Sequence, residues 1–168
     1  MSGLASPLVI GIGNMLLRDE GVGVRVVAEL ARGFAGGGPA VPPGTRFVDG
    51  GTLGLDLLPM IQDASILVLV DAVDLRRPPG SVAVLRGDAI EGMLVGHVSP
   101  HQVGVADLVA AARLLGALPE AISLVGIQPA AIEIGLELTA EVEQAVPVAM
   151  ARVCDELVAW SRAPLAVA

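Results

Sequence analysis

The sequence predicts an α/β fold of three layers, in which helices cover both faces of a mostly parallel sheet. Two observations support this fold class. Short apolar runs of strand length alternate along the chain with segments in which apolar residues recur at helical spacing. The strongest run, residues 65–70, is apolar at successive positions, as a central strand covered on both sides should be. The length of 168 residues favours a single domain spanning residues 1–168.

Five short apolar runs are predicted to form strands, and turn-forming residues such as Gly13-Asn14 and Asp49-Gly50-Gly51 follow them. The run at 81–85 alternates less cleanly than the others, which is typical of a strand at the edge of a sheet. The predicted strands comprise residues 8–12, 45–48, 65–70, 81–85 and 122–127.

The predicted helices occupy the segments between these strands, at residues 20–35, 52–61 and 99–115. Thr52 can cap the second helix, and Ser99, Pro100 and Gln102 form a capping box at the start of the third. Residues 139–160 also have a helical pattern, but Pro147 lacks the N–H that a helix interior needs. We therefore expect a short helix to about residue 145, a longer one from residue 147, and a frayed tail over residues 163–168.

The composition excludes several classes of chemistry. The ten basic residues are all arginine, against eighteen acidic residues, so the net charge is −8. Without lysine the chain cannot form a GKS/GKT phosphate-binding loop, a Schiff base or a Ser-Lys dyad. A single cysteine excludes an internal disulfide and a cysteine-rich metal site. Negative charge and 2% aromatic residues argue against nucleic-acid binding.

The hydrophobic content of 54% raises the question of a membrane segment, but we expect none. The longest stretch with little charge, residues 114–132, contains Glu120, two prolines and two glycines. It is a poor match to the ~20 apolar residues that a span requires. The amino terminus lacks the basic region of a signal peptide. We therefore expect a cytoplasmic protein.

The glycine-rich turn at residues 11–14 has two interpretations. It resembles the start of a dinucleotide fingerprint, but Leu16 stands where the third glycine belongs, and Asp49 comes 49 − 11 = 38 residues after Gly11 instead of ~20. A tight strand exit that leaves room above the sheet is the alternative. Gly21 and Gly23, in the first turn of the next helix, indicate that something packs closely against that turn.

Three residues, Glu20, Asp71 and His101, are candidates for a ligand-binding site because each follows a predicted strand or begins a predicted helix. Asp19 and Glu20 can act as a helix cap and a first-turn acid, or Glu20 can bind a ligand. Asp71 ends the central strand, where open α/β sheets place their ligands, although it can also cap the next turn. His101 begins a helix, where the dipole favours the neutral, metal-ligating imidazole.

These three positions can converge at one edge of a parallel sheet. One imidazole and two carboxylates suit Ni, Zn, Fe or Mn, and leave room for water or substrate. We expect His97 and Asp74 to be solvated and Cys154 to lie in the core. No G-x-S-x-G motif is present, which disfavours a serine hydrolase.

In combination, these motifs resemble the maturation endopeptidases of nickel–iron hydrogenases. The resemblance runs in order from about residue 8 to residue 160, and the combination of GIGN-x4-DEG-x-G, DGG-T and HQ is specific. The matching segments are GIGNMLLRDEGVGVRVVAEL (11–30), VDGGTLGLDLL (48–58), LVLVDAVD (67–74), SPHQVGVADLVAAARL (99–114) and LVGIQPAAIEIGLELTAEV (124–142).

The resemblance implies a phosphorylase/hydrolase-like α/β/α fold with a five-stranded mixed sheet, in which residues 81–85 are our candidate for the antiparallel strand. It implies a metal-dependent endopeptidase that removes a short C-terminal tail from the nickel-loaded hydrogenase large subunit. The family's metal-contacting residues correspond to Glu20, Asp71 and His101. The nickel would be presented by the substrate, and zinc or cadmium could substitute for it. Pro100 is a departure from other members.

Three hypotheses follow. The first is endoproteolysis, with Glu20, Asp71 and His101 as both the catalytic and the metal-contacting residues, and with Asp49, Gly50 and Gly51 shaping the rim. The second is a non-catalytic nickel-sensing chaperone of the large subunit, favoured by the lack of a recognisable nucleophile. The third is a nucleotide-binding domain that uses residues 11–14. A monomer is the expected state.

Overall fold

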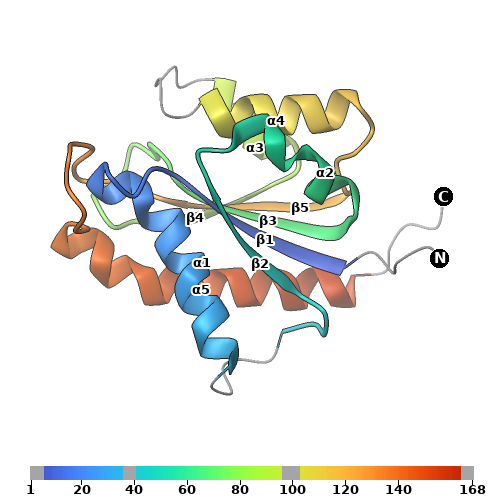
Figure 1. Ribbon diagram of the computed structural model, residues 1–168, viewed down its shortest axis with the longest axis horizontal. Coiled ribbons are helices and arrows are strands. Elements are labelled where there is room, and N and C mark those ends of the chain that lie inside the picture. The colour runs from blue at the N-terminus through green and yellow to red at the C-terminus, as the bar shows by residue number, and fades with distance from the viewer. Residues whose placement is uncertain (1–5, 36–40, 96–102, 164–168) are drawn as a thin grey trace.

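The computed structural model describes residues 6–35, 41–95 and 103–163, and a five-stranded sheet with helices on both faces forms its centre (Figure 1). The sheet confirms the predicted α/β class and all five predicted strands. Its strand order is β2-β1-β3-β5-β4, and only β4 is antiparallel to its neighbour. The antiparallel edge strand is the one that the irregular alternation indicated. The strands are β1 (Ser6–Ile12), β2 (Arg46–Gly51), β3 (Ala64–Ala72), β4 (Val82–Arg86) and β5 (Ala121–Ile127).

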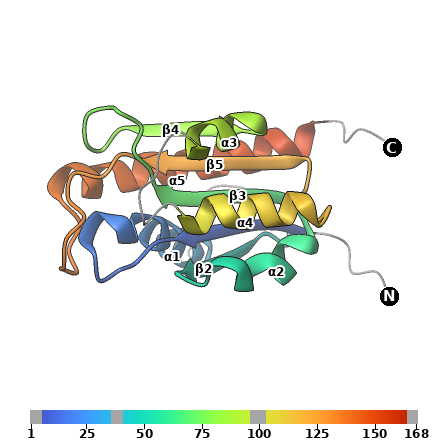
Figure 2. The same ribbon diagram turned by 90° about the horizontal axis from the view of Figure 1, so that it is seen from above.

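Helices form a layer on each side of the sheet (Figures 1 and 2). Helices α1 (Val22–Ala35) and α5 (Ala140–Arg162) cover one face. The other face is covered by α2 (Leu58–Gln62), α3 (Asp88–Val95) and α4 (Val103–Leu114). Two 3₁₀ helices, η1 (Arg18–Gly21) and η2 (Gly54–Leu57), lead into α1 and α2. None of the helices in the described ranges is long and apolar enough to cross a membrane.

The prediction that Pro147 divides the last helix is wrong, because α5 is continuous through it. Pro147 lies on the exposed side of α5, where water can hydrate the Glu143 carbonyl that loses its N–H partner. An apolar stripe at helical spacing holds both halves of α5 to the same face of the sheet, so burial outweighs the lost hydrogen bond. The stripe comprises Val142, Ala145, Val146, Ala149, Val153 and Leu157.

Two further helix predictions need correction. Thr52 caps nothing, because the helical segment begins at Gly54 with Leu53 at the cap position and no side-chain cap bond. Gly54 has a φ of 54°, so regular helix starts only after it. Helix α3 was not predicted from the sequence; it is a short element after the edge strand, with Ile90 buried. The predicted capping box at residues 99–102 and the tail from residue 164 lie outside the described residues.

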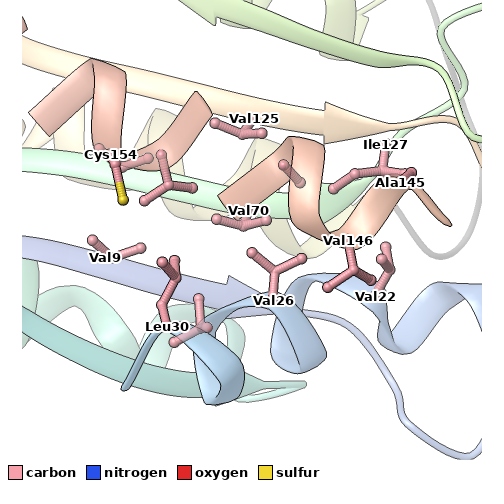
Figure 3. Close-up of a cluster of buried hydrophobic side chains, with 14 of the residues drawn as sticks. Val9, Val22, Val26, Leu30, Val70, Val125, Ile127, Ala145, Val146 and Cys154 are labelled. Atoms are coloured by element: carbon pink, nitrogen blue, oxygen red, sulfur yellow. The ribbon is translucent and has the colours of Figure 1, made fainter. Parts of the chain in front are cut away.

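The two faces of the sheet bury different side chains. In β3, Val68 and Val70 face α1 and α5, whereas Leu67 and Leu69 face the layer of α2, α3 and α4. Figure 3 shows the valine-rich cluster on the first face, with Cys154 of α5 among its members. The predicted core position of Cys154 is therefore confirmed. Because β3 is covered on both faces, its uninterrupted apolar run has the physical origin that the sequence indicated.

A buried polar cluster fixes the antiparallel edge of the sheet to α5. Glu156 of α5 is 4% exposed and accepts hydrogen bonds from Arg86 of β4 and from the Ser123 hydroxyl of β5. The Trp160 indole N–H donates to the same hydroxyl at 2.8 Å. Burial would raise the pKa of Glu156, but these partners hold it below its ordinary value. This cluster ties β4, β5 and α5 together near the start of β5.

The first turn of α1 packs backbone against backbone on the ends of β1 and β3. A Cβ atom on Gly23 would collide with the carbonyl oxygens of Ile12 and Val70. One on Gly11 would collide with the carbonyl oxygen of Gly23. Gly13 has a φ of 132° and lies against the Glu20 carbonyl oxygen. A Cβ atom on Gly21 would in turn meet the Met15 backbone. The close packing that Gly21 and Gly23 predicted is therefore confirmed, and it decides how near the residues before α1 come to β3.

Two alanine substitutions in α1 test this packing. Gly23→Ala is expected to lower the free energy of unfolding by about 3 kcal/mol, because its methyl group meets backbone carbonyls that cannot move independently. Gly33→Ala, in the same helix with open space around it, is expected to raise that free energy by about 0.5–1 kcal/mol. Urea unfolding measures both values. Equal effects at the two positions would contradict the packing argument.

Candidate functional site

The strand order creates a crevice at the carboxyl ends of β1 and β3. From β1 the chain goes to β2 on one side and then returns past β1 to β3 on the other. This reversal is the topological switch point, at which open α/β sheets bind ligands. Two acidic residues lie there: Glu20 in η1, after β1, and Asp71, the penultimate residue of β3. The sequence predicted this convergence for Glu20 and Asp71, and the structure brings the two residues together.

Both carboxyl groups are buried, and they interact. Glu20 is 7% exposed and Asp71 is 4% exposed. Burial raises the pKa of Asp71 well above its ordinary value, and the negative charge of Glu20 raises it further. A hydrogen bond from the Ala72 backbone N–H acts in the opposite direction but is outweighed. A proton or a cation near the pair therefore relieves an electrostatic cost. The Ala72 bond is the kind of contact that the turn-capping alternative requires, so that alternative and the ligand site both stay predictions for Asp71. Asp74 is exposed and accepts from the Arg76 N–H, as a turn residue should.

A cavity of about 290 Å³ opens beside Glu20. Its wall is formed by the turn after β1, the turn after β2, and two apolar side chains from η2 and α4. The hydrogen bond from the Gly13 N–H to the Gly51 carbonyl, 3.0 Å long, joins the two turns. The lining residues are Ile12, Gly13, Asn14, Leu17, Glu20, Gly51, Thr52, Gly54, Leu57 and Leu108. The turn after β1 thus leaves room above the sheet, as the strand-exit interpretation predicted.

The expected contribution of Asp49, Gly50 and Gly51 to the rim is only partly observed. Gly51 lines the cavity with a φ of 45°, and Gly50 is buried against Ile10. Asp49 is exposed on β2 and is not a lining residue. Leu57 and Leu108 are cavity residues that the sequence reasoning missed. The apolar periodicity of the two predicted helices indicates that such residues are buried. No feature of the neighbouring sequence shows which end of the sheet they cover.

Asp19 has a role that the sequence did not predict. It is fully buried, and it does not cap a helix. Its Oδ2 atom accepts hydrogen bonds of 2.9 Å from the N–H groups of Ala130 and Ala131 and from the Thr139 hydroxyl. Its Oδ1 atom accepts from the Thr139 N–H at 2.7 Å. The prediction of an N-cap was wrong because the partners lie more than a hundred residues away, in the loop after β5.

Arg18 fastens the same loop to the turn that carries Glu20. Its backbone N–H donates to the Gly135 carbonyl at 3.0 Å, and its side chain contacts Glu133 and the Glu137 carbonyl. Leu17 and Gly135 form an isolated parallel β-bridge. Figures 1 and 2 both show the loop between β5 and α5 beside η1. The Glu20 turn is thus held from both sides, by the sheet and by this loop.

The third predicted site residue, His101, lies outside the described residues, as does His97. Helix α4 runs antiparallel to its neighbouring strands, so its first residue, Val103, is at the carboxyl edge of the sheet (Figure 2). Within the described ranges, no three His, Cys, Asp or Glu side chains form a metal-binding group. The described part of the site is therefore a pair of carboxylates, which fits one side of a cation and leaves the remaining ligands to other groups.

The fold and this pair define an α/β protein with an acidic ligand site at its topological switch point. A family model described as hydrogenase maturation protease matches residues 24–156, a range that includes Asp71 and His101 and begins after Glu20. The chain is 39% identical over 155 residues to the hydrogenase expression/formation protein HupD of Rhodobacter capsulatus, covering 91% of this chain and 71% of that protein. It is 35% identical over 151 residues to the hydrogenase 2 maturation protease of Escherichia coli K12, covering 89% of each.

Solved structures agree with these relatives. The hydrogenase maturating endopeptidase HybD from E. coli superposes with a TM-score of 0.81 at 34% identity, over 92% of this chain and 93% of that one. The [NiFe] hydrogenase maturation protease HybD from Thermococcus kodakarensis gives 0.73 at 26% identity, over 90% and 99%. The chain belongs to the hydrogenase maturation protease family.

Replacing the Asp19 carboxylate tests the loop attachment. Burial would raise the pKa of Asp19, but hydrogen bonds from Thr139, Ala131 and Ala130 outweigh it and hold the pKa below 3.8. The stability that the ionised form contributes is therefore present above the unfolded pKa and is lost as the pH falls through the lower folded value. Asp19→Asn is expected to cost about 2–3 kcal/mol at pH 7, with a smaller difference near pH 3.

Urea unfolding at the two pH values measures this difference, and hydrogen exchange at Ala130, Ala131 and Thr139 should accelerate in the variant. The exposed Asp63→Asn is the matched control and should change neither quantity. A cost that persists undiminished at pH 3 would contradict the role of the charge.

Asp71→Asn should have the opposite effect on stability. Because the folded pKa of Asp71 is raised, folding favours the protonated form, and the ionised form costs stability as the pH rises above 3.8. Removing the charge is expected to raise the free energy of unfolding at pH 7 and to change it little near pH 3.5. Urea unfolding at both pH values measures this. A variant that is less stable than the wild type at pH 7 would show that Asp71 has a stabilising partner in the free protein.

Proposed function

We propose that this protein is a cytoplasmic endopeptidase that removes a short C-terminal peptide from the nickel-loaded large-subunit precursor of a nickel–iron hydrogenase. Membership of the hydrogenase maturation protease family supports the reaction and the substrate class. The single structural observation that carries the site assignment is the pair of buried, electrostatically coupled carboxylates of Glu20 and Asp71 at the carboxyl edge of the sheet.

The electrostatics of the pair favour a substrate that carries a cation. Two carboxylates that are both ionised in a low-dielectric crevice repel each other, and a divalent cation presented between them replaces that repulsion with attraction. Carboxylate oxygens together with an imidazole suit nickel, and zinc or cadmium as a substitute. We therefore assign Glu20, Asp71 and His101 as the residues that recognise nickel already bound in the precursor. The nickel belongs to the substrate, so a precursor without it lacks the group that these residues recognise.

The two carboxylates have different positions and hence different tasks. Glu20 lines the cavity, whereas Asp71 is not one of its lining residues. The Glu20 carboxylate can therefore reach a water molecule held beside the scissile bond and accept its proton during attack on the carbonyl carbon. Asp71, which is buried beside Glu20, contributes its negative charge and holds the presented cation in place. Recognition of the cation by both residues positions the scissile peptide over the cavity.

We propose that water is the nucleophile. The described lining residues include the Thr52 hydroxyl but no serine or cysteine, and Cys154 lies in the core on the opposite face of the sheet. Burial raises the pKa of the Cys154 thiol, which keeps it protonated and unreactive. In this proposal a water molecule hydrolyses the peptide bond directly, with Glu20 as the base.

The lack of a serine or cysteine among the described lining residues favours a second candidate function, a nickel-sensing chaperone that docks on the large subunit and cuts nothing. Both functions use Glu20, Asp71 and His101 to detect nickel. They differ in the fate of the precursor, which loses its C-terminal tail in one case and keeps it in the other. Intact-protein mass spectrometry separates them directly.

The test incubates the protein with nickel-loaded and nickel-free precursor and follows tail loss by mass. We expect cleavage only with nickel, and we expect Glu20→Gln, Asp71→Asn and His101→Ala each to slow it by about 100-fold or more. Asp74→Asn is the matched control, since this exposed carboxylate lies three residues from Asp71, and it should cleave at the wild-type rate. Equal cleavage of nickel-free precursor, or full activity of Glu20→Gln, would overturn the assignment.

A further inference from the structure

Large apolar side chains gather on the loops around the candidate site. Seven of those exposed among the described residues lie on the three connections that follow β1, β2 and β5, with Leu55 within η2, and all three connections start at the carboxyl edge of the sheet. Ile134 is 92% exposed and Leu136 is 75% exposed, values that are unusual for side chains of this kind. The seven are Met15, Leu16, Leu53, Leu55, Ile132, Ile134 and Leu136.

Two of these loops form one surface. The Gly135 N–H donates to the Leu16 carbonyl at 3.0 Å, next to the bridge between Leu17 and Gly135. We call the exposed side chains of this joined surface the apolar rim: Met15, Leu16, Ile132, Ile134 and Leu136. Its inner edge is continuous with the cavity, since Gly13, Asn14 and Leu17 of the same turn line that cavity.

The apolar rim is held in place before any partner arrives. Asp19 accepts four hydrogen bonds from the loop after β5, and Arg18 adds a backbone and two side-chain contacts. These bonds hold the loop in a conformation in which its aliphatic side chains stay exposed to water. The free protein therefore gains no hydrophobic stabilisation from those side chains. A surface fixed in this way loses little conformational entropy on binding. The arrangement is typical of a docking surface and not of a solvated loop.

Charge around the apolar rim indicates the chemistry of the partner. The segment of residues 128–143 contains four glutamates and no basic residue. Arg18 pairs with Glu133 and Arg25 pairs with Glu143, while Glu137 and Glu141 add further negative charge. A partner that fits has an aliphatic centre bordered by basic side chains. A second copy of this chain does not fit, because a two-fold contact would bring the acidic border against itself.

We propose that the apolar rim is the docking surface for the large-subunit precursor, which it contacts through an aliphatic patch bordered by basic residues beside the scissile bond. This inference rests on the proposed function for the identity of the partner. Docking here places the precursor directly over the cavity and the Glu20–Asp71 pair. Affinity for the folded precursor then comes from the rim, and recognition of the loaded metal comes from the carboxylates. The two contributions are separable by experiment.

The test variant is Ile134→Ser/Leu136→Ser, and the matched control is Leu114→Ser/Leu115→Ser. The control leucines are 87% and 61% exposed, and they lie at the far end of α4, at the amino edge of the sheet. Binding is measured by calorimetry with nickel-free precursor, and tail removal is measured by mass with nickel-loaded precursor. Melting curves followed by circular dichroism confirm that both variants are folded.

The rim variant is expected to bind nickel-free precursor about tenfold more weakly or worse, with KM raised to a similar extent and kcat within about twofold of the wild type. The control should match the wild type in all three values. Unchanged binding and KM in the rim variant, or an equal loss in the control, would overturn the docking surface.

Failure of the docking surface and failure of the proposed function give different results. If the wild type removes no tail but binds the precursor through the rim, the docking surface stands and the protease assignment fails. If the wild type removes the tail and the rim variant binds and cleaves equally well, the docking surface fails and the protease assignment stands. Sedimentation velocity tests whether a second copy of this chain binds the apolar rim instead. A dimer that forms in the wild type and is lost in the rim variant would assign the rim to self-association and overturn the proposal.

Discussion

The contact on which the rest of the structure depends is the backbone packing of the first turn of α1 against β1 and β3. Gly23 lies directly against the carbonyl oxygens of Ile12 and Val70, at a distance that admits no side chain. Because of this contact, the 3₁₀ turn before α1 sits on the edge of the sheet instead of extending into solvent. Glu20, three residues before Gly23, is thereby brought within electrostatic reach of Asp71. The candidate site is a consequence of how two glycine-rich segments pack.

A second set of interactions connects this turn to a distant part of the chain. Asp19 and Arg18 are neighbours of Glu20, and between them they bind the loop after β5 at several points. The three consecutive residues 18–20 therefore have separate tasks, of which two hold a loop and one faces the cavity. Asp19 has hydrogen-bond donors for both of its carboxylate oxygens. The single backbone bond that Asp71 accepts is outweighed by burial and by the charge of Glu20. The loop that Arg18 and Asp19 hold also carries Ile134, the most exposed large apolar side chain among the described residues.

The two buried acids at this edge differ in a way that separates structure from function. Hydrogen bonds lower the pKa of Asp19, so its charge stabilises the fold. Burial and a neighbouring negative charge raise the pKa of Asp71, so its charge is a cost that the fold tolerates. Residues that cost stability in the free protein are typical of functional sites, because the ligand provides the missing interaction. In our proposal, nickel carried by the precursor is that ligand.

Much of the fold could be predicted from the sequence, because its signals are local. Alternation of strand-length runs with helical spacing predicted the five strands and the α/β class, and the apolar run of β3 predicted its central place. The irregular apolar pattern of residues 81–85 also identified β4, one of the two edge strands. Pro147 misled the prediction of α5, because the cost of a proline is local but the apolar stripe that outweighs it is buried only by the tertiary structure. Helix α3, a short element, was missed.

For the site, the order of residues along the chain was enough to show which side chains stand at strand ends and helix starts, and so to identify Glu20, Asp71 and His101 as candidates. The contacts of Asp19 with a loop more than a hundred residues away, and the place of Leu57 and Leu108 in the cavity wall, became visible only in the folded chain. The same holds for the aliphatic side chains from two separate loops that form one rim. The physical reason is that periodicity and spacing report on a residue's own segment, whereas hydrogen bonds and cavities depend on segments that only folding brings together.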